Sequence, residues 1–121
     1  MVVRDEVDSL RQRRFAANQT VFRRANERLS QRLGALASER VQYVCECGDD
    51  SCGDLITLLT SEYEHVRSNS AWFVIALDHE ILSGDAERIL ETHHDHQVVE
   101  KSGAAGATAV ATDNRQNRAA L

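Results

Sequence analysis

All three cysteines of the chain, Cys45, Cys47 and Cys52, fall in one short stretch between two apolar runs. Thiolate sulfur is a soft metal ligand, and three such atoms can converge on one ion at about 2.3 Å. Gly48 directly follows the first two cysteines, and we expect it to provide the bend that returns the third to them. The pattern C-x-C-x4-C therefore predicts a metal-binding turn on which the flanking segments fold.

The predicted ion is Zn²⁺, with iron left open, and a structural zinc site has four ligands. We expect His79, in the segment ALDHE after the most apolar run, to be the fourth ligand. His65 is the alternative. The histidines His93, His94 and His96 follow a predicted helix, where the helix dipole favours histidine without any metal.

Two other interpretations of the cysteines stay open. They can be small, partly buried apolar residues, or a redox pair with a third, resolving thiol. Acidic residues around them, such as Glu46, are expected to be solvated, as charged loop residues usually are.

A long amphipathic helix is predicted over residues 5–37. This segment has one glycine and no proline, and four large apolar residues recur at every seventh position: Phe15, Phe22, Leu29 and Leu36. We expect this stripe to dock on the protein's own sheet or, in part, on a partner. Arginines such as Arg23 are expected to lie mostly outside it.

After the helix, alternating apolar residues predict strands and capping residues predict short helices. The expected strands are 41–45, 55–59, 71–77 and 97–101, and the expected helices are 61–68, opened by a capping box of Ser61 and Glu64, and 85–94. The predicted fold is therefore an α+β domain over residues 5–101. In it the long helix precedes a ββαβαβ unit, residues 41–101, with a small, mostly antiparallel sheet and the metal turn. Residues 102–121 are expected to form a partly disordered tail with, at most, a short helix near Ala107.

The stretch YVCECGDDSC, followed by S-E-Y-E-x-V-R, by W-F-V and by an H-E pair, resembles a family of small uncharacterised actinobacterial proteins. Members of that family share a helix motif N-x-x-x-F-R-x-x-N-E, matched here by Asn18, Phe22, Arg23, Asn26 and Glu27. The resemblance covers roughly residues 15–101. It departs at Asp78, where the family usually has glycine before the histidine. The resemblance implies a shared fold and site and brings no established activity.

The charge is divided unevenly along the chain. Residues 1–40 carry nine arginines against five acids, and residues 41–121 carry five basic residues against fourteen acids. The basic helix can therefore contact nucleic acid or an acidic protein surface. Because the rest of the chain is acidic and only six residues are aromatic, a protein partner or a second copy of the chain is favoured.

The sequence contains no G-x-S-x-G, no phosphate-binding glycine loop and no H-E-x-x-H, so we do not expect an enzyme. The predicted function is a small zinc-stabilised binding or regulatory module that acts through protein–protein contact. One alternative is a thiol redox switch that releases zinc on oxidation. The other is a nucleic-acid-associated factor that uses the basic helix.

A cytoplasmic location without membrane contact is expected. No run approaches the ~20 apolar residues that span a bilayer, and the first residues lack the apolar core of a signal peptide. An odd number of clustered cysteines is also atypical of a secreted disulfide framework.

Overall fold

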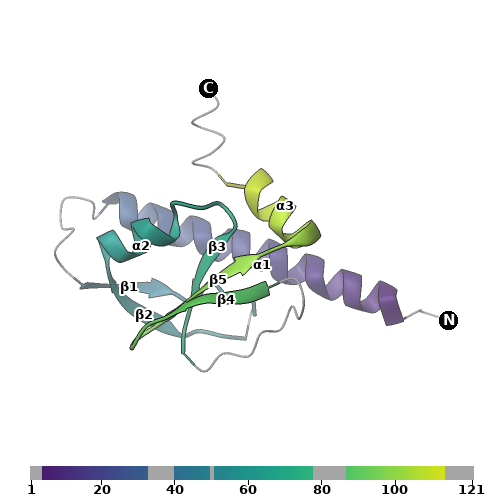
Figure 1. Ribbon diagram of the computed structural model, residues 1–121, viewed down its shortest axis with the longest axis horizontal. Coiled ribbons are helices and arrows are strands. Elements are labelled where there is room, and N and C mark those ends of the chain that lie inside the picture. The colour runs from purple at the N-terminus through teal and green to yellow at the C-terminus, as the bar shows by residue number, and fades with distance from the viewer. Residues whose placement is uncertain (1–3, 33–39, 50, 78–86, 114–121) are drawn as a thin grey trace.

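The computed structural model describes residues 4–32, 40–49, 51–77 and 87–113 (Figure 1). Their helices and strands, in chain order, are α1 (Arg4–Arg32), β1 (Arg40–Val44), β2 (Leu55–Leu59), α2 (Thr60–Val66), β3 (Trp72–Ile75), β4 (Glu87–Thr92), β5 (Gln97–Lys101) and α3 (Gly103–Ala111). The predicted α+β class with small antiparallel sheets is confirmed. In this part of the chain, no helix combines the length and the apolar character needed to cross a membrane.

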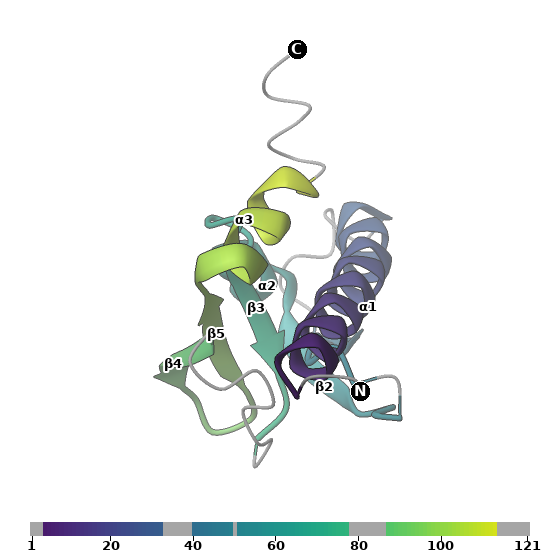
Figure 2. The same ribbon diagram turned by 90° about the vertical axis from the view of Figure 1, so that its right-hand side faces the viewer.

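The strands form two antiparallel sheets. β1 pairs with β2, and β5 lies between β3 and β4. A backbone hydrogen bond from the Glu46 N–H to the Val74 carbonyl, 2.8 Å, joins the segment after β1 to β3. Figure 2 shows α1 and β4 on opposite sides of the molecule, with β3 and β5 between them.

The apolar core lies between these sheets and the helices. Alternate side chains of β2 point to opposite faces of its sheet, so Ile56 and Leu58 are buried in the core while Leu55 and Thr57 face outward. The ring of Tyr43 on β1 stacks on the ring of Tyr63 on α2 with centroids 4.6 Å apart. The other core residues come mainly from β3 and β5: Phe73, Val74, Ile75, Val98 and Val99.

The buried face of α1 is polar, which the apolar stripe did not predict. At helical spacing along it lie Gln19, Arg23, Asn26, Glu27 and Ser30, each at most 5% exposed. Leu29 packs against the core and Phe22 is half-buried, while Leu36 is outside the described residues and the Phe15 side chain is not described.

The expectation that arginines lie outside the packed face is therefore wrong for Arg23. Its guanidinium donates to the carbonyls of Ser70 (2.7 Å) and Ala109 (2.8 Å), and it lies 4.8 Å from the centre of the Phe73 ring. These contacts compensate the burial of the charge.

The helix predicted over residues 85–94 is wrong where the structure describes it, since Glu87–Thr92 forms strand β4. Its residues pair with β5 in antiparallel register, Ile89 opposite Val99, with a bulge before Glu91. Local propensity favours a helix in this segment, but pairing with β5 overrides it. The described elements after α1 are therefore ordered ββαβββα rather than ββαβαβ.

The predicted cap of α2 is also wrong. The helix begins at Thr60, and the Glu62 carboxylate accepts from the Leu59 N–H at 2.8 Å. Glu64 instead accepts from the Ser30 hydroxyl of α1 at 2.7 Å. Glu62 therefore caps the start of α2, and Glu64 links α2 to α1.

Helix α3 forms where a short helix near Ala107 was expected, and it packs on α1. Ala109 is buried, and Asp113 just beyond the helix forms an ion pair with Arg67 at 2.7 Å. A Cβ at Gly106 would lie 2.8 Å from the Lys101 carbonyl oxygen, so this close approach requires glycine. The rest of the predicted tail, residues 114–121, lies outside the described residues.

Candidate metal centre

The sulfurs of Cys45, Cys47 and Cys52 all lie within 4.8 Å of one another. Cys45 directly follows β1 and Cys52 precedes β2, so the hairpin itself brings them together. The loop is closed by hydrogen bonds from the Cys45 N–H to the Asp54 carbonyl (3.0 Å) and from the Cys52 N–H to the Asp49 carbonyl (3.1 Å). Gly48 has a φ of 86°, the left-handed conformation that the predicted bend needs. The three-thiol cluster is compatible with metal binding.

The thiols of Cys45 and Cys52 are poor acids in these surroundings. A hydrogen bond with Cys47 and then burial raise the pKa of Cys45 well above its usual range. Burial is the main cause that raises the pKa of Cys52, and the neighbouring Cys47 charge raises it further. Deprotonation therefore needs a nearby positive charge, which a bound cation would supply.

A backbone N–H already points at one sulfur. The Ala76 N–H, just after β3, donates to Cys45 Sγ at 3.3 Å. Hydrogen bonds of this kind orient thiolate ligands and stabilise their charge.

Of the two histidines expected as the fourth ligand, only His65 is among the described residues. His79 lies outside the described residues, three positions after Ala76, the residue that contacts Cys45. His65 is directed elsewhere, since its Nε2 lies 2.9 Å from a Glu91 oxygen and its ring meets the edge of Trp72. Among the described residues, the group that could hold a metal ion therefore consists of the three cysteines and does not include His65.

The other histidines do not follow a helix. His93, His94 and His96 lie between β4 and β5, so the helix-dipole explanation for them is wrong. His96 is buried and its Nδ1 lies 2.6 Å from an Asp95 oxygen.

Helix α1 holds the backbone of the cysteine segment. Three of its side-chain amides donate to alternate carbonyls: Asn26 to Val44 (2.8 Å), Gln19 to Glu46 (3.1 Å) and Asn18 to Gly48 (2.8 Å). These carbonyls belong to every second residue from the end of β1 onward, and the three amides satisfy them where no described strand does. Gln19 and Asn26 are buried on the polar face of α1 because they satisfy two of these carbonyls.

Glu46, between two cysteines, is fully buried rather than solvated. Its carboxylate accepts from Asn26 Nδ2 (2.9 Å), the Tyr63 hydroxyl (2.8 Å) and the Val74 N–H (3.1 Å). Burial raises the pKa of Glu46, and these three hydrogen bonds oppose that rise. Burial likewise raises the pKa of Tyr63. Glu46 therefore ties the cysteine segment to α1, α2 and β3 at once.

Sequence reasoning missed these supporting residues because it assigned polar side chains to solvent. The motif carrying the family resemblance contained a signal, since Asn18, Arg23, Asn26 and Glu27 recur at helical spacing on one side of α1. Three of them are at most 5% exposed.

Comparison of the chain with protein-family models, with curated proteins and with solved structures found no match. The resemblance to the actinobacterial family stays a prediction.

Proposed function

We propose that this protein is a small binding module whose fold is stabilised by a structural zinc ion. Cys45, Cys47 and Cys52 are three of its ligands, and His79 is the fourth. The observation that carries the proposal is the convergence of the three sulfurs within 4.8 Å. Two sulfurs bound to one tetrahedral zinc at about 2.3 Å lie about 3.8 Å apart, so a small contraction of the cluster suffices.

The surroundings favour a structural ion over a thiol switch. The thiolate is the reactive form of cysteine, and the raised pKa values of Cys45 and Cys52 keep these two thiols protonated in the metal-free protein. The loop is also held by the amides of α1 and by buried Glu46, so the ligands need little rearrangement. A site rich in thiolates is moreover a weak Lewis acid, which favours a structural over a catalytic metal.

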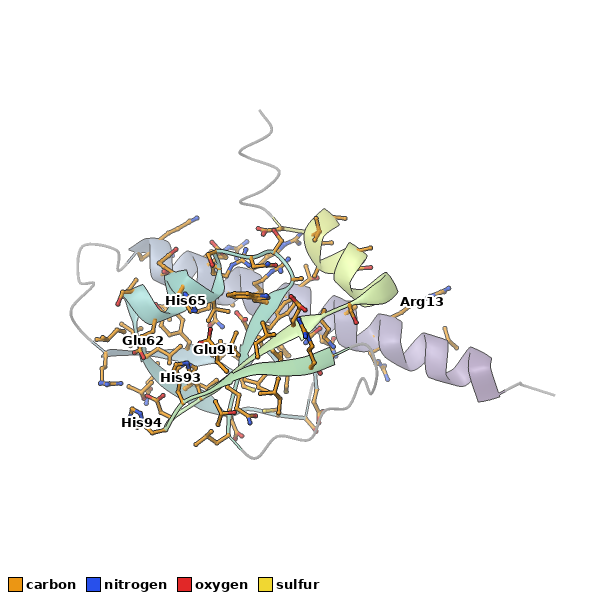
Figure 3. The ribbon with its side chains drawn as sticks, viewed as in Figure 1. Arg13, Glu62, His65, Glu91, His93 and His94 are labelled. Atoms are coloured by element: carbon orange, nitrogen blue, oxygen red, sulfur yellow. The ribbon has the colours of Figure 1, made fainter. Side chains whose placement is uncertain are left out.

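Support for a binding role comes from the outer face of α1, the side opposite its buried polar residues. We define this face by its exposed side chains: Leu10, Arg13, Arg14, Ala17, Val21, Arg24, Ala25, Arg28 and Arg32. Leu10 and Val21 are each 61% exposed, and Figure 3 shows Arg13 extending outward from the helix. Glu27, an acid of the same helix, is buried against Arg67 and does not neutralise this face.

The contact proposed for this face is an acidic protein surface with an apolar centre. Arginine supplies charge and hydrogen bonds at a contact, and exposed leucine and valine supply apolar area. Figure 1 shows the N-terminal turns of α1 extending past the strands, where a partner can approach from several sides.

Metal content tests the first half of the proposal. Native mass spectrometry of the full chain should show one bound zinc ion, and Cys47→Ser should lose it and melt at a lower temperature, since metal-binding energy is folding energy. Thr57→Ala, an exposed change on β2, is the control and should keep the metal. Stoichiometric zinc in a folded Cys47→Ser variant would remove the cysteines from the ligand set.

Charge reversal tests the second half. Arg24→Glu on the outer face should abolish retention of a partner that wild type and Arg88→Glu, an equal charge change on β4, both retain. Sedimentation of the chain alone distinguishes a second copy from another protein. Salt-dependent binding to duplex DNA would instead indicate a nucleic-acid partner. In a plot of the logarithm of the affinity against the logarithm of the salt concentration, the slope should be roughly −1 for each phosphate contacted.

A further inference from the structure

The outer edges of the two sheets are β1 and β2 in one and β3 and β4 in the other, and hydrogen bonds close the edges of β1 and β3. At Val44 on β1, the Asn26 side chain bonds both the N–H and the carbonyl, each at 2.8 Å. At Val74 on β3, the carbonyl accepts from the Glu46 N–H at 2.8 Å, and the Val74 N–H donates to the Glu46 carboxylate at 3.1 Å. These two positions are therefore not open to another chain.

The edge of β4 is protected in a different way. This strand carries the charged residues Glu87, Arg88 and Glu91, and a bulge before Glu91 interrupts its pairing with β5. Charged side chains and bulges at a sheet edge discourage pairing with the strand of another molecule.

Strand β2, Leu55–Leu59, has neither kind of protection. Its sequence LITLL contains no charged residue and no proline, and its register with β1 is unbroken. In the part of the chain that the structure describes, β1 is the strand paired with β2, and the other side of β2 has no paired strand. A regular, uncharged edge rich in aliphatic residues is the kind that pairs with another strand.

The backbone groups of Leu55 and Thr57 point to this open side. The Cys45 N–H donates to the Asp54 carbonyl at 3.0 Å, so Asp54 faces β1, and residues along a strand face its two neighbours alternately. Leu59 agrees with this alternation, because its N–H donates to a carboxylate of α2 at 2.8 Å and not to β1. Leu55 and Thr57, which share its orientation, thus present their N–H and carbonyl groups outward.

We propose that the β2 edges of two copies of this chain pair in antiparallel orientation and form a symmetric dimer. In a register symmetric about Ile56, Leu55 of each copy lies opposite Thr57 of the other, so the outward backbone groups of both residues are matched. The Leu55 side chain, 57% exposed in the single chain, then packs beside the Thr57 side chain across the new pair.

A second copy is the partner that matches this edge. Every molecule brings a strand of the same length and the same uncharged sequence, so no charge is placed opposite an apolar residue. The pairing also joins two sheets of two strands into one larger sheet, and a sheet of two strands alone is only marginally stable. The interface uses neither the cysteines nor the outer face of α1, so it goes beyond the proposed function and does not depend on it.

The test is sedimentation velocity of the full chain over a series of concentrations. A short strand edge buries less area than a standard interface, so we expect a weak dimer that forms as the chain concentration rises from about 10 µM to about 1 mM. Over the same range, hydrogen exchange at the Thr57 N–H should become slower, because this group is then bonded to the second copy.

Two lysine substitutions locate the interface. Thr57→Lys places a charge at the open edge and should weaken association about tenfold or more. Gln42→Lys is the matched control, since Gln42 is exposed and lies opposite Thr57 on β1. It adds the same charge to the same face one strand away from the edge, and association should stay within about twofold of wild type. Each variant's amide spectrum verifies that it is folded.

Several results would overturn the inference. A monomer over the whole concentration range does so, and so does hydrogen exchange at the wild-type Thr57 N–H that is independent of concentration, whatever the variants show. Equal weakening in Thr57→Lys and Gln42→Lys also overturns it. A dimer lost in Arg24→Glu but kept in Thr57→Lys would assign self-association to the outer face of α1 instead.

Discussion

The side chain of Asn26 makes both backbone hydrogen bonds of Val44. Its Nδ2 donates to the Val44 carbonyl and its Oδ1 accepts from the Val44 N–H, each at 2.8 Å. The same Nδ2 donates to buried Glu46 at 2.9 Å. The Asn26 side chain therefore makes the two hydrogen bonds that a neighbouring strand would otherwise make to the Val44 backbone. Both N–H groups and the oxygen of its amide are hydrogen-bonded.

Asn26→Asp should destabilise the fold strongly. The change keeps the acceptor for the Val44 N–H, removes both donated hydrogen bonds and buries a second carboxylate beside Glu46. We expect a loss of about 2–5 kcal/mol in the free energy of unfolding. Urea unfolding measures it, with Ala25→Asp at an exposed neighbouring position as the control, expected to cost less than about 1 kcal/mol. Equal losses in the two variants would contradict the role given to Asn26.

A chain ending at residue 101 should be much less stable than one ending after Asp113. Arg67 forms ion pairs with Glu27 and Asp113, and the three side chains are at most 6% exposed. Removing Asp113 leaves part of a buried charge network without its partner, which costs about 3–5 kcal/mol. Thermal unfolding of the two truncated chains measures the difference. Matching midpoints would show that α3 and Asp113 contribute little, as expected of a tail.

Gln19→Ala should weaken metal binding without removing a ligand. Gln19 donates to the Glu46 carbonyl within the cysteine segment, so its loss frees the loop to move. Supporting residues of this kind typically change metal affinity about 10–100-fold. Competition with a zinc chelator measures the affinity, and Gln31→Ala, at an exposed position of the same helix, is the control. Identical affinities for the two variants would mean that α1 does not support the loop.

The sequence predicted the features that depend on neighbouring residues. The strands at 55–59 and 97–101 were predicted with their observed bounds, because β-branched and aliphatic residues there are bounded by turns. The approach of the three cysteines followed from their spacing and from Gly48.

Features decided by distant partners were not predictable in this way. Glu87–Thr92 is a strand because the edge of β5 is there to pair with it, and its own composition favours a helix. Arg23 and Asn26 face inward because the carbonyls they satisfy lie far along the chain. A rule that places apolar residues inside and polar residues outside cannot identify buried polar groups that have partners.

The indole N–H resonance of Trp72 should report the titration of Glu100, whose pKa is lower than that of an ordinary glutamate. Trp72 Nε1 donates to Glu100 at 3.2 Å, and Arg88 Nε donates to the other oxygen at 3.0 Å. The hydrogen bond from Trp72, followed by that from Arg88, lowers the pKa of Glu100. Because the folded pKa is below the unfolded one, about 4.3, the stabilisation is complete above that pH and is lost as the pH falls through the folded pKa.

We therefore expect the indole N–H resonance in metal-free protein to titrate with a midpoint below about 4.3. In Glu100→Gln this titration should vanish, and the unfolding midpoint should depend less on pH in the same acid range, since this carboxylate no longer takes up a proton on unfolding. A wild-type midpoint at or above the ordinary glutamate value, or an unchanged titration in Glu100→Gln, would show that the bond joining β3 to β5 and β4 does not form in solution.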